Sequence, residues 1–174
     1  MLKGDKIYLR PLKLEDANYT LSLRYDLDSI NSLMGYPFPV NLDCEIEWIR
    51  SLYGKGLRDK IYLGIIDQES QEFVGYLSLQ NINYIDRVGE FGIIIDKKYR
   101  GKGFAKEAIS LFLDYLNKNF AIRKVTLKVF SDNLIAIELY KKLGFEIEGK
   151  LIKHSFSNSI FKDVLIMSKF LARE

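Results

Sequence analysis

A glycine-containing turn between an apolar run and an amphipathic segment constrains the fold of this chain more than any other feature. Ile93-Ile94-Ile95 predicts a strand buried on both faces, because three consecutive β-branched residues leave no polar face for water. The turn that follows contains Gly101 and Gly103. Beyond it, apolar residues recur at three- and four-residue steps, the spacing of a helix that lies on a sheet: Phe104, Ala108, Leu111, Phe112 and Tyr115. We therefore expect a strand, a tight turn and a helix in succession.

Such a turn is suited to binding an anion. Glycines allow close backbone approach, and the free amides and dipole at a helix start attract phosphate oxygens. The stretch is also basic, with Lys97, Lys98, Arg100, Lys102 and Lys106. On these residues alone, an ordinary strand-to-helix turn is equally compatible. A P-loop does not fit, and a dinucleotide-binding turn would need a third glycine where Lys106 stands.

The rest of the chain alternates between strand and helix patterns without a regular βαβ repeat, which indicates an α/β fold. Helices are expected to open at 14–17, to run from 41–43 through Leu52, and to run from Ser131 or Asp132 through Leu143, with Gly144 as a left-handed end residue. Strands are predicted at 7–10, 61–67, 73–79, 89–96, 124–130, 145–151 and 161–170, with a hairpin turn at 67–72.

Length and composition narrow the class of protein. A chain of 174 residues suits one domain spanning 1–174, and a composition that is 48% hydrophobic and 28% charged is ordinary for a globular protein. The formal charge of +3 comes without a nucleic-acid-binding motif, and no segment reaches the roughly 18 apolar residues that cross a bilayer, so we expect neither nucleic acid nor a membrane as partner. With one cysteine, Cys44, and one histidine, His154, no metal site is expected, and a reducing cytoplasmic location fits best.

Three segments resemble one family. Arg100-x-x-Gly103-x-Ala105 is similar to the Arg/Gln-x-x-Gly-x-Gly/Ala signature of GNAT superfamily acetyltransferases. A second segment resembles a motif typical of the same proteins and comprises Asn133, Ala136, Tyr140, Leu143, Gly144 and Phe145. The opening 8–12 with Glu15-Asp16 is similar to the RimJ/RimL-type branch, and 82–87 with Glu90-Phe91 is similar to spermidine N-acetyltransferases.

The resemblance implies a GNAT fold, with a single mixed, mostly antiparallel sheet of about seven strands flanked by about four helices. It implies acetyl-CoA as donor and direct acetyl transfer to a primary amine, on a polyamine-like small molecule or a peptide N-terminus. Glu90 would be the base, through water, and Tyr140 the general acid. The cofactor-binding residues would be Ile93, Ile94, Ile95, Arg100, Gly101, Lys102, Gly103, Phe104, Ala105, Lys106, Asn133, Ala136 and Tyr140. A homo-oligomer is possible.

The acceptor stays open. Polyamine-binding relatives carry acids where Tyr36-Pro37-Phe38-Pro39 and Asn81 stand here. Trp48 and Tyr53 could line an acceptor site, but their spacing is equally that of a core stripe. The alternatives are a non-catalytic acyl-CoA-binding or sensing domain, and an acetyltransferase for an amino sugar or an antibiotic.

Overall fold

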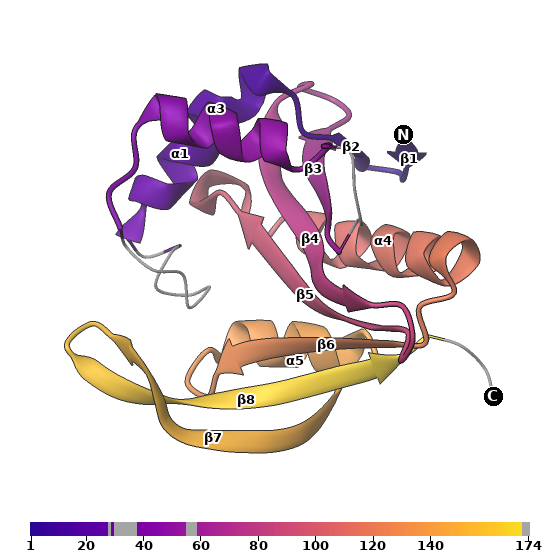
Figure 1. Ribbon diagram of the computed structural model, residues 1–174, viewed down its shortest axis with the longest axis vertical. Helices are drawn as coiled ribbons and strands as arrows, with labels where there is room; N and C mark the ends of the chain where they lie inside the picture. The colour runs from indigo at the N-terminus through magenta and orange to yellow at the C-terminus, as the bar shows by residue number, and fades with distance from the viewer. Residues whose placement is uncertain (28, 30–37, 55–58, 172–174) are drawn as a thin grey trace.

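The computed structural model describes residues 1–27, 29, 38–54 and 59–171, and within them one eight-stranded sheet carries the fold (Figure 1). The strand order is β1-β2-β3-β4-β5-β6-β8-β7. The strands are β1 (Leu2–Lys3), β2 (Ile7–Pro11), β3 (Ile61–Asp67), β4 (Phe73–Asn83), β5 (Val88–Ile95), β6 (Lys124–Phe130), β7 (Glu146–Ser157) and β8 (Ile160–Phe170). The α-helices are α1 (Ala17–Tyr25), α3 (Leu42–Ser51), α4 (Phe104–Phe120) and α5 (Leu134–Lys142), with short 3-10 turns at Leu14–Asp16 and Lys97–Tyr99.

The sheet is antiparallel except at one joint. β5 and β6 run parallel and pair over only three residues each, 88–90 with 124–126. Beyond that joint β5 continues along β4, and β6 continues along β8, so the two halves of the sheet separate. Figure 1 shows the resulting opening between β5 and β6.

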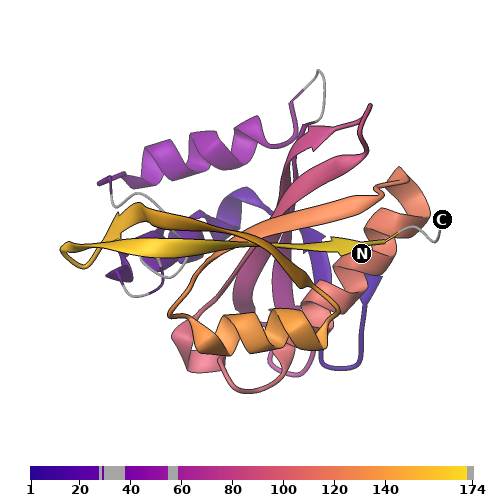
Figure 2. The same ribbon diagram turned by 90° about the horizontal axis from the view of Figure 1, so that it is seen from below.

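Helices cover both faces of the sheet. α1 and α3 lie on one face, above a cluster that includes Leu23, Ile49 and Ile94. α4 and α5 pack on the other face, around a larger cluster that includes Phe112 and Leu127. Figure 2 shows α3 and α5 on opposite sides of the sheet, with the β7–β8 hairpin projecting beyond them. The stripe predicted for α4 packs against the sheet as expected, with Phe112 fully buried.

The mixed, mostly antiparallel sheet, the turn at 67–72 and the left-handed Gly144, at φ 84°, are confirmed. About seven strands were predicted and the sheet has eight, of which β1 has only two residues and is too short to show alternation. The last helix is capped by neither Ser131 nor Asp132. Asn133 caps α5, since its Oδ1 accepts from the Ala136 amide at 3.2 Å, whereas the Asp132 carboxylate binds Lys162 Nζ at 2.7 Å.

Candidate active site

The opening between β5 and β6, closed on one side by α5, forms a cleft of about 350 Å³. It brings together many of the residues singled out from the sequence, although they are far apart along the chain. Those that line it are Glu90, Ile93, Ile94, Ile95, Arg100, Ala105, Asn133, Ala136 and Tyr140. Gly101, Lys102, Gly103, Phe104 and Lys106 do not line this cleft. They belong to the turn and the helix start at its edge.

The turn has the backbone conformation that its glycines predict. Gly101 and Gly103 have φ of 78° and 87°, in the left-handed region, and Gly103 is the N-cap of α4. A Cβ added at Gly101 would meet nothing within 4 Å, so the turn is open on that side. The first amide of α4 that donates to a backbone carbonyl is that of Glu107, to Gly103 at 3.2 Å. Within the described part of the chain, the amides of 101–106 are thus left for an anion.

The Arg100 side chain turns back under this loop. Its Nε donates to the Ile95 carbonyl at 3.1 Å, and Nη2 donates to Ser29 Oγ at 2.6 Å. Ser29 in turn donates to Asp26 Oδ2 at 2.7 Å. Arg100 therefore braces the end of β5 against the region that follows α1.

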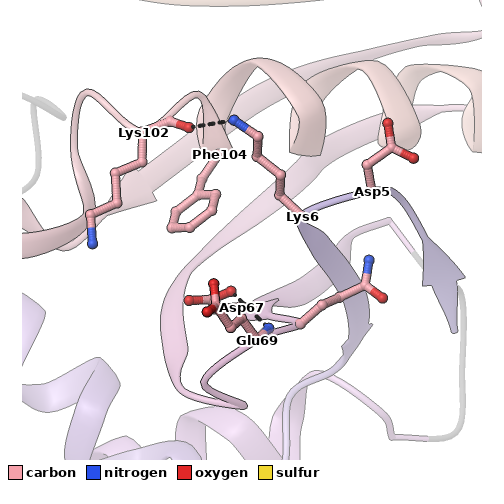
Figure 3. A pocket seen from close by; sticks show the side chains of 7 residues that line it. Asp5, Lys6, Asp67, Glu69, Lys102 and Phe104 are labelled. Atoms are coloured by element: carbon pink, nitrogen blue, oxygen red, sulfur yellow. Dashed lines mark hydrogen bonds between the residues drawn. The ribbon is translucent and has the colours of Figure 1, made fainter.

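Lys102 and Phe104 face a different cavity, on the outer side of the same turn (Figure 3). This cavity is larger, at about 550 Å³, and is lined mainly by the charged groups of the 5–6 and 67–69 turns. Lys6 Nζ donates to the Lys102 carbonyl at 3.3 Å across it. Since it contains neither Glu90 nor Tyr140, we assign no acetyl-transfer chemistry to it.

Tyr140 projects from α5 into the cleft with its ring packed in the core. Its ring centroid lies 6.5 Å from that of Phe91, edge-on, and 5.7 Å from that of Phe145. Only 9% of the residue is exposed, and burial raises the pKa of Tyr140 to about 12. The phenol therefore stays protonated at neutral pH and can donate a proton.

Glu90 faces the other wall of the cleft, at the last paired position before β5 and β6 separate. Its Oε1 lies 3.2 Å from Lys128 Nζ, and both side chains are about one-third exposed or more, at 35% and 41%. Asn133 uses Oδ1 to cap α5, and it also lines the cleft. Tyr140, Glu90 and Asn133 thus line the same cleft, where the sheet opens.

The sequence did not single out several residues that line the cleft, among them Ser29, Gln80 and Lys128. Lys128 could have been found from the sequence pattern. It lies on a strand with alternating residues, two positions beyond the residue that pairs with Glu90, and therefore on the same face. Ser29 could not, since only the folded chain brings it to Arg100. In the described residues, no three His, Cys, Asp or Glu side chains gather as a metal site, and no helix is long and apolar enough to span a bilayer.

Comparison with known proteins agrees with this geometry. The Acetyltransferase (GNAT) domain family matches residues 6–146. The chain is 34% identical over 170 residues to spermidine N(1)-acetyltransferase of Escherichia coli K12, covering 98% of this chain and 89% of that protein. It is 31% identical to the Vibrio cholerae enzyme, with 98% of each covered.

Solved structures of the Vibrio cholerae spermidine N-acetyltransferase share the fold. The complex with CoA and spermine superposes with a TM-score of 0.89 at 28% identity, covering 97% of each chain. A dodecameric structure of that enzyme superposes with a TM-score of 0.83 at 29% identity, covering 97% of this chain and 95% of that one. With the glycine turn, the cleft and these similarities in agreement, the chain belongs to the GNAT family of acetyltransferases and is an acetyl-CoA-dependent N-acetyltransferase.

Proposed function

We propose that this acetyltransferase transfers the acetyl group in the cleft between β5 and β6, with Glu90 as base and Tyr140 as general acid. One observation carries the proposal. The place where the two strands separate has a solvent-accessible carboxylate on one wall and a buried, protonated phenol on the other.

The cleft suits the donor, acetyl-CoA, whose thioester supplies the activated acetyl group. The unpaired amides of 101–106 and the start of α4 would hold its phosphates. Ile93, Ile94 and Ile95 lie on β5 beyond its short pairing with β6, and among the described residues no strand pairs with that edge, so backbone groups there can bind the amide-containing arm. Asn133 and Ala136 would contact that arm from α5. Arg100 would act by fixing the turn.

Glu90 would prepare the acceptor. An alkyl amine with a pKa near 10 is neutral in only about one molecule in a thousand at pH 7, so a group that accepts its proton is needed. Glu90 lies in the cleft and is reached by solvent, so the proton can pass to it through a water molecule. Lys128, its ion-pair partner, would keep the carboxylate oriented.

Tyr140 would donate a proton to the departing thiolate. The leaving group is a thiolate, and an apolar site disfavours this anion by raising the pKa of the thiol above its usual value near 8.5. A proton donated to the sulfur therefore makes its departure faster. Burial keeps the Tyr140 phenol neutral well above physiological pH.

The acceptor would be a primary amine of a small molecule or of a peptide N-terminus. Spermidine is the substrate in the names of the relatives, and a small amine is the simpler fit to a cleft of about 350 Å³. Of the positions where acids are expected in polyamine-binding relatives, Tyr36 and Pro37 lie outside the described residues.

Exposed apolar side chains at one end of the molecule favour a homo-oligomer. The β7–β8 hairpin exposes Ile152, Phe156, Ile160 and Phe161, each more than half exposed. Exposed apolar groups of this size mark contact surfaces. The dodecameric structure of the Vibrio cholerae relative supports self-association.

Acetyl-CoA turnover with a panel of primary amines tests the proposed function. Tyr140→Phe and Glu90→Gln should each lower kcat by about 100-fold while CoA affinity stays near that of the unaltered protein. Tyr115→Phe, on the partly buried stripe of α4 away from the cleft, is the matched control. A protein that binds CoA, acetylates no amine and is indifferent to Tyr140→Phe would be an acyl-CoA-binding domain instead.

A further inference from the structure

The turn before α4 is contacted, on its outer side, by a side chain from near the amino terminus. Lys6, in the connection between β1 and β2, donates from Nζ to the Lys102 carbonyl at 3.3 Å, 96 residues away in sequence (Figure 3). A Cβ added at Gly103 would lie 3.7 Å from the same ammonium. Lys6 therefore lies directly against the peptide that joins Lys102 to Gly103.

The main chain around Lys6 is fixed without help from the ammonium. Glu107, in the first turn of α4, accepts from the Lys6 amide at 2.9 Å and from the Ile7 amide at 3.4 Å. On the other side, the Gln68 amide donates to the Lys6 carbonyl at 2.9 Å. Gly4 leaves room for this packing, because a Cβ there would collide with Glu107 Oε1. These backbone bonds attach the segment to α4, and the Lys6 side chain is left for another role.

The ammonium brings an uncompensated positive charge to the turn. Lys6 is exposed, and it forms no ion pair with any described residue, although Asp5, Asp67 and Glu69 line the same cavity. Its hydrogen-bond acceptor among the described residues is the neutral Lys102 carbonyl. The charge therefore acts on the peptide of the turn.

This bond fixes the direction of one amide of the turn. The 102–103 peptide is trans, so its carbonyl and its N–H point to opposite sides. With the Lys102 carbonyl turned to Lys6, the Gly103 N–H points away from the outer cavity. It donates to no backbone carbonyl of the described residues. Arg100 and Ala105, on either side of it in sequence, line the cleft, so this N–H is available to a group bound at the edge of the cleft.

A turn with two glycines gains from such a bond. Gly101 and Gly103 both have a left-handed φ, and glycine has more conformational freedom to lose than any other residue. A charged donor makes a stronger hydrogen bond than a neutral one, and it polarises the peptide so that the N–H on the other side becomes a better donor. A turn held in this way before its ligand arrives pays less ordering entropy on binding.

We propose that Lys6 is a positioning residue for the acetyl donor. Its ammonium fixes and polarises the 102–103 peptide, so that the Gly103 N–H is directed at a donor phosphate before the donor binds. Lys6 acts through this peptide and does not itself touch phosphate. The inference rests on the proposed function of the turn, whose amides would hold the phosphates of acetyl-CoA.

Lys6→Met tests this proposal, because it keeps the length of the side chain and the backbone bonds while it removes the charge and the donor. The Kd of CoA, measured by calorimetry, should rise about tenfold, the size expected when one charge-assisted hydrogen bond is lost. The inhibition constant of pantetheine, which has the same arm without phosphates, should stay unchanged. In turnover, the KM for acetyl-CoA should rise while kcat stays within about twofold, since only binding is affected.

Two further variants separate the contact from the net charge. Lys6→Arg keeps a charged donor and should restore most of the CoA affinity. Lys3→Gln removes an exposed positive charge of β1 that does not line the outer cavity, and it should leave CoA affinity unchanged. Circular dichroism verifies that each variant is folded.

The Gly103 amide proton gives a readout that a merely structural role would not move. Its chemical shift in the protein without CoA reports how strongly the peptide is polarised by a donor on its carbonyl. Lys6→Met should move this resonance upfield and leave the Ile82 amide, which donates to the Asp59 carbonyl elsewhere, where it is. If the side chain only anchored the β1–β2 segment, the resonances of residues 2–9 would move instead.

The proposal is overturned if folded Lys6→Met binds CoA as tightly as the unaltered protein, if it weakens CoA and pantetheine alike, or if Lys3→Gln weakens CoA equally. Weaker CoA binding with an unmoved Gly103 resonance would mean that Lys6 contacts phosphate directly, which also contradicts positioning.

Gly103→Val separates these results from a failure of the proposed function. If Gly103→Val loses CoA binding and Lys6→Met does not, the role of Lys6 alone is wrong. If neither variant changes CoA affinity, the turn does not hold the phosphates, and both proposals fail.

Discussion

Tyr140 and Glu90 share one cleft but have opposite surroundings. Tyr140 is enclosed by aromatic rings, and Glu90 is reached by water and paired with Lys128. This difference suits a phenol that keeps its proton and a carboxylate that exchanges one. A second buried phenol lies beneath α3, where burial also raises the pKa of Tyr76 to about 12.

These two phenols should make folding stability depend on alkaline pH. Each has a pKa of about 12 when folded, against about 10 in an unfolded chain. Their contribution to stability is therefore fully present below pH 10 and is lost as pH rises through about 12. In an ultraviolet titration of phenolate absorbance, Tyr140→Phe and Tyr76→Phe should each remove one late-titrating group. An unchanged late phase in either buried variant would contradict this.

At the scale of elements, the turn between β5 and α4 depends on glycine at one position above all. Gly103 has a left-handed φ of 87° and opens α4. Gly103→Val should abolish measurable CoA binding, because a β-branched residue resists this φ and blocks approach to the backbone. Gly149→Val, where no atom lies within 4 Å of an added Cβ and φ is ordinary, is the control. Calorimetry on folded protein measures both, and unchanged CoA affinity in Gly103→Val would refute the role of the turn.

Where β4 pairs with β5, the glycines should differ in whether they tolerate an added side chain. A Cβ at Gly75 would lie 2.1 Å from the Ile94 carbonyl oxygen, which is backbone and cannot rotate away. Gly75→Ala should therefore lower the free energy of unfolding by about 3 kcal/mol. Gly92→Ala, whose Cβ meets a side-chain hydroxyl at 3.4 Å, should cost less than about 1 kcal/mol. Urea denaturation compares the two, and equal losses would show that the Gly75 contact relaxes.

Elements with a clear hydrophobic periodicity could be predicted from the sequence. Contacts between elements that are far apart in the sequence could not. The strand at 93–95, the glycine turn and the α4 stripe are local patterns, and the structure has each of them, although Ile93 is only partly buried. β1 is too brief to show a period, and the choice of Asn133 over Asp132 as cap depends on Lys162, 30 residues away in sequence. The bracing of Arg100 by Ser29 is likewise a product of packing. The catalytic and cofactor roles came from resemblance and remain predictions.

At the scale of the whole molecule, the β7–β8 hairpin carries large apolar side chains that are exposed on both of its strands. Phe156 and Phe161 face each other with centroids 5.1 Å apart, and each is 64% exposed. We predict that the protein self-associates and that Phe156→Asn/Phe161→Asn shifts it toward monomer in sedimentation velocity. Ile85→Asn removes an apolar side chain that is 92% exposed elsewhere and should leave the assembly intact. A monomeric unaltered protein would contradict this prediction.

The brief joint between β5 and β6 has one more consequence. A sheet that parts in its middle has two internal edges, each with backbone donors and acceptors that none of the described strands satisfies. A donor molecule lying between them would act as the missing strand, so that its binding also completes the sheet. Its free energy of binding then adds to the free energy of unfolding, by about 2.7 kcal/mol at a concentration 100 times its Kd. The thermal stability of this enzyme should therefore follow the supply of its acetyl donor.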